Sequence, residues 1–140
     1  MNAEARGALY LDASALVKLV LPEAESEALL AFLAGGPELI TSTVGAIETR
    51  RALLVAGGDE DLAEEAEKVL TTVTLVGITE PIRHAAGALR PALLRTLDAI
   101  HLATALSFGA ELEAFVAYDR RLAEAALAAG LDVRAPGAAP

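Results

Sequence analysis

The sequence predicts an α/β protein: a three-layer α/β/α arrangement with a central parallel sheet of four to five strands. Short apolar or β-branched runs alternate with longer helical segments, the order found when helices cover both faces of a parallel sheet. Two of these apolar runs end in an aspartate that leads directly into a helical segment. Hydrophobic residues make up 54% of the 140 residues, which is enough for one sizeable core.

Turn and capping residues divide the first half of the chain into six elements. They are a strand at 8–11, a helix opened by Ser14 that ends before Pro22, a helix at 27–33 capped by Ser26, a strand at 38–41, a helix from Ser42 or Thr43 to Gly57, and a helix at 59–70.

The second half continues the alternation and finishes the sheet. It contains a strand at 73–76, a helix at 79–89 with Pro81 in its first turn, a helix at 97–108 capped by Thr96, a strand at 114–117, a helix at 120–129 and an edge strand at 131–134. No repeat or change of composition divides the chain, so residues 1–140 are expected to form one domain, with 135–140 as a frayed tail.

Composition excludes several classes of function. The chain has no cysteine, which rules out disulfides, thiolate zinc sites and cysteine nucleophiles and is compatible with a reducing cytoplasm. No apolar run is long enough to span a membrane, and the N-terminal residues make a poor signal peptide. The net charge of −9 argues against broad affinity for nucleic acid, although bound cations could offset acids within a site.

Asp12 and Asp119 are the first candidates for a functional site. Each follows an apolar strand and precedes a helix, so each could serve simply as a helix cap. Ser14 is present to cap the first helix, however, which leaves Asp12 free at the sheet edge where ligands bind in parallel sheets. If the two strands are neighbours, the repeated design brings both acids together.

Glu48 and Asp98 are candidates because their surroundings are apolar. Glu48 lies beside a buried stripe of its helix, where an ionised carboxylate needs a partner; Arg51 or Lys18 could be that partner. Asp98 is the one acid between Pro81 and Gly109, although the helix dipole also favours an acid in a first turn.

Four clustered carboxylates repel one another unless a cation is bound. An oxygen-only ligand set favours Mg²⁺ or Mn²⁺ over zinc, and such ions support hydrolysis of phosphodiesters. His101, one turn after Asp98, is expected to be structural, and His84 and the acidic run 59–67 to be surface. The cations that follow Glu48 and Asp119 could hold an RNA backbone or form surface ion pairs; they are Arg50, Arg51, Arg120 and Arg121.

Four segments in order resemble the PIN-domain ribonucleases, and among them the VapC-like toxins of bacterial toxin–antitoxin pairs. The segments are YLDASALVKL, ITSTVGAIETRRAL, LRTLDAIHLATAL and FVAYDRRLAEAA, and they cover most of the chain. The resemblance places the family's acidic quartet on Asp12, Glu48, Asp98 and Asp119, and its supporting hydroxyls on Ser14 and Ser42.

The resemblance implies an endoribonuclease dependent on Mg²⁺ or Mn²⁺ that cuts structured RNA, often tRNA or ribosomal RNA, to leave 5′-phosphate and 3′-hydroxyl ends. It also implies a homodimer and inhibition by a VapB-like antitoxin. Lys18 and the arginines are candidate phosphate contacts. One departure is Ala117, where many relatives have a hydroxyl residue two positions before the fourth acid.

Other classes fit less well. A receiver domain needs an aspartate at the end of its third strand, and VTLVGITE offers none. A phosphatase of the haloacid dehalogenase type needs a second aspartate at position 14, which is serine. The remaining alternative is a PIN fold kept as a non-catalytic scaffold that binds RNA or a protein partner.

Overall fold

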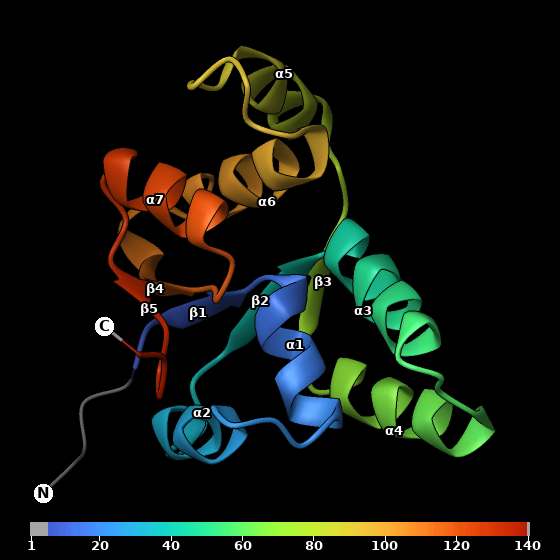
Figure 1. The fold of residues 1–140 in the computed structure, drawn as a ribbon. Coiled ribbons are helices and arrows are strands. Elements are labelled where there is room, and N and C mark those ends of the chain that lie inside the picture. Colours follow the sequence, from blue (N-terminus) through green and yellow to red (C-terminus); the bar gives the residue numbers. More distant parts are fainter. Residues whose placement is uncertain (1–5, 140) are drawn as a thin grey trace, which may run out of the picture.

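A five-stranded parallel sheet forms the centre of the computed structural model, which describes residues 6–139 (Figure 1). The strands lie in the order β3-β2-β1-β4-β5, and every pair of neighbours is parallel. The strands are β1 (Ala8–Leu11), β2 (Leu39–Ser42), β3 (Thr74–Val76), β4 (Leu112–Val116) and β5 (Val133–Arg134). The predicted fold class and the final edge strand are confirmed.

Seven α-helices and one short 3₁₀ turn connect the strands in the described part of the chain. The helices are α1 (Ala13–Val20), α2 (Ser26–Leu33), α3 (Thr43–Val55), α4 (Glu60–Leu70), α5 (Glu80–Ala88), α6 (Thr96–Leu106) and α7 (Arg120–Ala128). Every predicted helix is present, with ends displaced by one or two residues. None of these helices is long and apolar enough to cross a bilayer.

The side chains of β1 alternate between two hydrophobic cores, one on each face of the sheet. Tyr10 packs with Phe115, Leu102 and residues of α7 on one face, whereas Leu9 and Leu11 pack with α1 and α2 on the other. Figure 1 shows α6 and α7 together on one side of the sheet and α1, α2 and α4 on the opposite side. All four side chains of β1 are buried, as expected for a central strand of a parallel sheet.

The position of β1 determines where a site can form. The chain passes from β1 to β2 on one side and later places β4 on the other. The carboxyl end of β1 is therefore a topological switch point, where open α/β sheets bind ligands. β1 and β4 are neighbours, which meets the condition under which their shared strand–acid–helix design brings the two acids to the same edge.

Three capping predictions are wrong. Ser26 and Thr96 are the first residues of their helices, and neither Glu25 nor Arg95, which precede them, makes a side-chain capping bond. The Ser26 hydroxyl instead donates to the Lys18 carbonyl at 2.7 Å, so it fastens α2 to the end of α1. Ser14 does not cap α1 either, as described below.

The chain beyond Arg134 turns back onto the protein as far as residue 139. The Tyr118 hydroxyl donates to the Pro136 carbonyl at 2.8 Å, and Gly137 lies against Glu25 and Ala28. These contacts attach the end of the chain to the loop between β4 and α7.

Gly45 allows α3 to approach β2 closely. A Cβ atom at this position would lie 2.3 Å from Thr41 Oγ1 and 3.1 Å from His101 Cε1. Both neighbours are fully or almost fully buried, so neither can move aside cheaply. The first turn of α3 therefore depends on a residue without a side chain.

We expect Gly45→Ala to lower the free energy of unfolding by about 1–3 kcal/mol, since it overfills a packed contact. Gly87 provides the control: it is also helical, and nothing lies within 4 Å of its added Cβ. Gly87→Ala should be neutral or stabilising by up to about 1 kcal/mol. Urea denaturation of both variants measures the difference, and equal stabilities would contradict the close approach.

Candidate active site

Asp12 immediately follows β1 and caps α1. Its amide donates to the Val116 carbonyl of β4 at 3.2 Å, and its Oδ1 accepts from the Ala15 amide at 3.1 Å and the Ser14 hydroxyl at 2.6 Å. This corrects the expectation that Ser14 would cap α1. Oδ2 takes part in none of the hydrogen bonds found among residues 6–139, so Asp12 can cap a helix with one oxygen and offer the other to a ligand.

Ser14 links the loops that follow β1 and β4. Its hydroxyl accepts the Tyr118 amide at 2.9 Å and donates to Asp12 Oδ1. The two neighbouring strands are thus tied together directly beyond their ends. The structure places Ser14 against Asp12, which agrees with its expected supporting position.

Asp119 repeats the arrangement of Asp12 at the end of the β4 segment. Its Oδ1 accepts the Leu122 amide at 3.1 Å and so caps α7, while the residue remains exposed. Its charge raises the pKa of Asp12 and of Asp98. Asp119 therefore lies within electrostatic reach of both.

Asp98 lies in the first turn of α6 and is partly buried. Burial raises its pKa most, followed by the charge of Asp119; Glu48 acts in the same direction, while His101 and Arg95 oppose it. Asp98 therefore interacts electrostatically both with Asp119 at the sheet edge and with Glu48 on α3.

Glu48 is held by a buried hydrogen-bonded chain. Its Oε1 lies 2.5 Å from His101 Nε2, and His101 Nδ1 lies 2.7 Å from the Tyr10 hydroxyl. The expectation that Glu48 would pair with Arg51 or Lys18 is therefore wrong. His101 is 1% exposed, as expected for a structural histidine, yet it is in direct contact with a candidate catalytic carboxylate.

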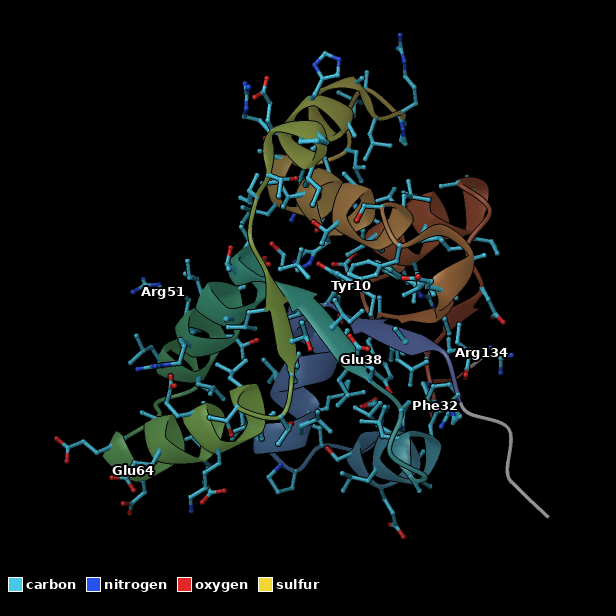
Figure 2. All side chains as sticks on the ribbon, turned by 180° about the vertical axis from the view of Figure 1, so that it is seen from behind. Tyr10, Phe32, Glu38, Arg51, Glu64 and Arg134 are labelled. Atoms are coloured by element: carbon cyan, nitrogen blue, oxygen red, sulfur yellow. The ribbon has the colours of Figure 1, made fainter. Side chains whose placement is uncertain are left out.

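The donor and acceptor of each hydrogen bond in the Tyr10–His101–Glu48 series can be assigned from the groups involved. The Ser42 amide donates to the Tyr10 oxygen at 3.1 Å, and burial keeps the pKa of Tyr10 above its ordinary value, so the hydroxyl proton is retained. A neutral imidazole that donates its Nε2 hydrogen to the Glu48 carboxylate has an unprotonated Nδ1, which can accept the Tyr10 hydroxyl proton. Figure 2 shows Tyr10 inside the molecule between the sheet and the helices above it.

Ser42 supports the site through its backbone and its side chain. Its hydroxyl accepts the Val44 amide at 3.2 Å and caps α3, one of the two caps expected there. Since its amide also fixes Tyr10, Ser42 positions both the helix that carries Glu48 and the chain that orients it.

Burial makes the charged form of Asp12 unfavourable. Asp12 is 4% exposed, and burial raises its pKa to about 6, against the opposing effects of its two hydrogen bonds and His101. Asp12 forms no ion pair with a cation among residues 6–139. A carboxylate that remains charged in such a place needs a cation.

The donor set fits a hard divalent ion in its chemistry, since it offers carboxylate oxygens without thiolates. In the described residues, no group of three or more acidic or histidine side chains is arranged so that it could hold a metal ion. The candidate carboxylates nonetheless interact through their charges. The charge of Asp119 raises the pKa of Asp12, and the charges of Asp119 and Glu48 raise the pKa of Asp98.

Of the basic residues expected to contact phosphate, Lys18 lies near the candidate acids, whereas Arg50 and Arg51 are directed away from them. Lys18 pairs with Glu25 at 2.7 Å and lies over the Tyr118 ring, but it also lines a hollow of about 370 Å³ together with Ser14 and Glu48. Arg51 points outward from α3 (Figure 2). Arg50 turns away to pair with Glu67.

Sequence reasoning missed the link from Tyr10 through His101 to Glu48. One signal was available, because His101 follows Asp98 by one helical turn and so shares its face of α6. The partner residues come from β1 and α3, however, and nothing local to the sequence pairs them.

Comparison with known proteins identifies the family. The chain matches the PIN domain over residues 9–127. It is 40% identical to Ribonuclease VapC46 of Mycobacterium tuberculosis over 92% of this chain and 98% of that protein. It is 46% identical to Ribonuclease VapC35 of the same species over 94% and 98% of the two chains.

Solved structures support the same fold. The crystal structure of M. tuberculosis VapC20, titled a sarcin–ricin loop cleaving toxin, superimposes with a TM-score of 0.69 at 21% identity and covers 88% of this chain and 95% of that chain. VapBC2 from Rickettsia felis gives 0.71 at 12% identity, with 92% and 98% coverage. The protein belongs to the PIN-domain family. Within that family it is a member of the VapC ribonucleases.

The burial of Asp12 predicts a gain in stability when its charge is removed. Its folded-state pKa of about 6 exceeds the ordinary 3.8, so folding loses free energy as pH rises from about 4 to about 6. In metal-free solution at pH 7.5, we expect Asp12→Asn, which keeps a capping oxygen, to raise the free energy of unfolding by about 1–3 kcal/mol. Thermal denaturation at pH 4 and 7.5 measures it.

The matched control is Asp59, an exposed aspartate that caps α4 through the Leu62 amide. Asp59→Asn should give no such gain, because its charge already lies in water. A gain for Asp12→Asn that is the same at pH 4 and 7.5 would contradict the electrostatic explanation.

The hydrogen-bonded chain predicts a fixed imidazole tautomer. Nitrogen-15 NMR of His101 should show a protonated Nε2 and an unprotonated Nδ1. Tyr10→Phe keeps the stacking on Phe115, 5.2 Å between ring centroids, but removes the donor to Nδ1. We expect the variant to show a mixture of tautomers and to lose about 1–2 kcal/mol of stability. An unchanged tautomer would show that Glu48 alone fixes the ring.

Proposed function

We propose that this protein is the toxin of a toxin–antitoxin pair and acts as a metal-dependent endoribonuclease. The observation that supports this most strongly is that the charge of Asp119 acts on both Asp12 and Asp98, and that of Glu48 on Asp98, in a chain of the VapC family. The substrate we propose is structured RNA, either tRNA or ribosomal RNA, cut in the cytoplasm by a catalytic domain that spans the whole chain.

In this proposal the metal is Mg²⁺ or Mn²⁺, and Asp12, Asp98 and Asp119 hold it directly or through water. Such an ion would lower the pKa of bound water and offset the charge of the phosphate. The unused oxygens of Asp12 and Asp119 suit this role, because capping occupies only one oxygen of each.

Glu48 has a different part in the proposed mechanism. Its Oε1 is engaged by His101, which leaves Oε2 to orient the water that attacks phosphorus in line. Attack with departure of the 3′ oxygen leaves 5′-phosphate and 3′-hydroxyl ends. Tyr10 and His101 act through Glu48 and are positioning residues.

The proposed partners are a VapB-like antitoxin and a second copy of the chain. An antitoxin that covers a cluster of acids would present a basic side chain to it, since opposite charge is needed there. A non-catalytic scaffold that binds RNA or a protein remains the alternative function.

The test is cleavage of total RNA by purified, antitoxin-free protein. We expect discrete products with Mg²⁺ or Mn²⁺, none with a chelator, and a loss of rate of at least about a hundredfold in Asp12→Asn or Glu48→Gln. Asp61→Asn, which removes one charge from the exposed face of α4, is the control and should cut normally.

Each outcome has a defined meaning. Cleavage that persists in Asp12→Asn would point to a contaminating nuclease and remove the support for this site. Folded protein that binds RNA but cuts none under either metal would favour the scaffold alternative.

A further inference from the structure

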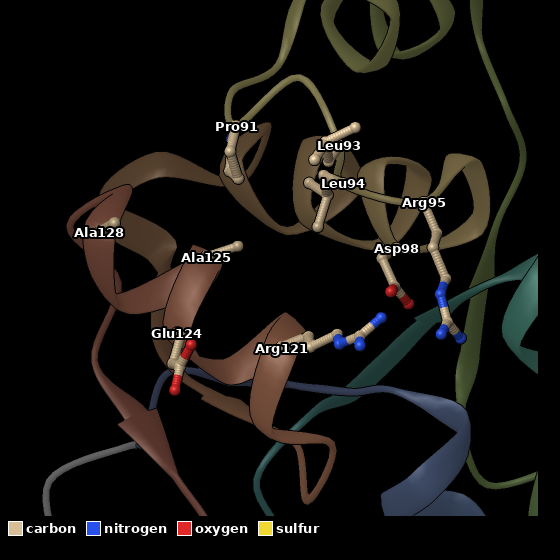
Figure 3. Close-up of a pocket in the computed structure, with 9 residues that line it drawn as sticks. All are labelled: Pro91, Leu93, Leu94, Arg95, Asp98, Arg121, Glu124, Ala125 and Ala128. Carbon is tan, nitrogen blue, oxygen red and sulfur yellow. The ribbon is translucent and has the colours of Figure 1, made fainter.

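A pocket of about 450 Å³ lies beside the acidic site, between α7 and the segment that leads into α6 (Figure 3). Its apolar lining comes from Leu93 and Leu94 on one side and from Ala125 and Ala128 on the other. Pockets of this size suit a small ligand or one unit of a polymer.

Asp98 joins this pocket to the candidate active site. It is one of the lining residues, and its carboxylate is coupled by charge to Asp119 and Glu48. A chain of linked units bound at the acids would therefore place a neighbouring unit at the pocket.

Two arginines stand at the same wall. Figure 3 shows the Arg121 side chain extending from α7 toward Asp98 and Arg95 lying on the other side of that carboxylate. Within residues 6–139, neither guanidinium takes part in an ion pair or a side-chain hydrogen bond. Most basic side chains are instead paired with carboxylates; these are Arg6, Lys18, Arg50, Lys68, Arg83 and Arg134.

These free guanidinium groups matter because the protein carries a net charge of −9. Overall charge repels a polyanion, so any phosphate contact must come from local cations. A guanidinium plane binds phosphate through paired donors and also stacks on a flat base.

We propose that the pocket takes one nucleotide of the RNA substrate, next to the bond that is cleaved. Its base lies against Leu93 and Ala128, and its backbone phosphate is held by Arg121 and Arg95. This inference rests on the proposed ribonuclease activity and gives that activity a local source of preference for one nucleotide.

Leu93 makes the proposal testable without damage to the fold. It is 95% exposed, so Leu93→Ala removes no buried contact. Leu127, 65% exposed on α7 and outside the pocket lining, is its matched control. Arg83, an exposed arginine on α5 that lies outside the pocket lining, is the control for Arg121.

The experiment measures binding of a fluorescein-labelled pool of short, random-sequence, single-stranded RNA to the four variants in the Asp12→Asn background. We expect Arg121→Ala to weaken binding about tenfold and to reduce the slope of log affinity against log salt by about 0.7. Leu93→Ala should weaken binding about fivefold with the salt slope unchanged. Arg83→Ala and Leu127→Ala should stay within about twofold of the parent.

A second readout uses the cleavage-competent protein. Sequencing of products from the random pool should show a nucleotide preference at one position beside the cut, and Leu93→Ala should broaden it. The Leu127→Ala control should keep the preference.

Several results would contradict the proposal that this pocket binds a nucleotide. Equal losses for Arg83→Ala and Arg121→Ala would indicate a general dependence on positive charge instead of a contact at the pocket. Normal cleavage with unchanged binding and preference in the Leu93 and Arg121 variants would reject the pocket while the ribonuclease stands. No cleavage by the parent and no RNA binding would reject both.

Other occupants are distinguished by two further measurements. A change of solution mass in Leu93→Ala, measured by light scattering, would assign the pocket to a second copy of the chain. Loss of antitoxin binding without loss of RNA binding would assign it to the antitoxin. Either result would contradict the nucleotide pocket.

Discussion

The burial of one ionisable carboxylate at the centre of the sheet is the constraint on which this structure depends. Asp12 lies at the switch point between β2 and β4, where the dielectric environment disfavours its charge. Two hydrogen bonds to one oxygen partly offset that cost. The other oxygen makes no hydrogen bond among residues 6–139, and the charge of Asp119 increases the need for a cation.

This arrangement removes the apparent conflict between capping and ligand binding. A capping carboxylate satisfies an orphan amide at a helix start, yet it has two oxygens, and the cap uses only one. Asp12 and Asp119 both exploit this, so the same residue stabilises a helix and presents a donor. Capping at a strand end is therefore no evidence against a role in chemistry.

The sequence was sufficient for the fold class because its elements are strongly punctuated. The repeated strand–acid–helix design also indicated that Asp12 and Asp119 would share an edge if β1 and β4 were neighbours, which they are. Sequence reasoning failed to identify which of two nearby polar residues caps α1: it chose Ser14, whereas Asp12 makes the capping bond. It also failed for the His101–Glu48 contact, which joins α6 to α3 and depends on how closely Gly45 lets α3 approach.

The fold of the chain beyond β5 has a consequence for anyone who handles this protein. Tyr118 contacts three separate parts of the chain. Its hydroxyl donates to the Pro136 carbonyl, its amide donates to the Ser14 hydroxyl, and Lys18 lies over its ring. Proteolytic cleavage or an engineered change that displaces residue 136 would remove the hydrogen bond to the Tyr118 hydroxyl. Since the Tyr118 amide donates to Ser14, and Ser14 donates to Asp12, a change at that end of the chain would be transmitted to the hydrogen bonds of Asp12.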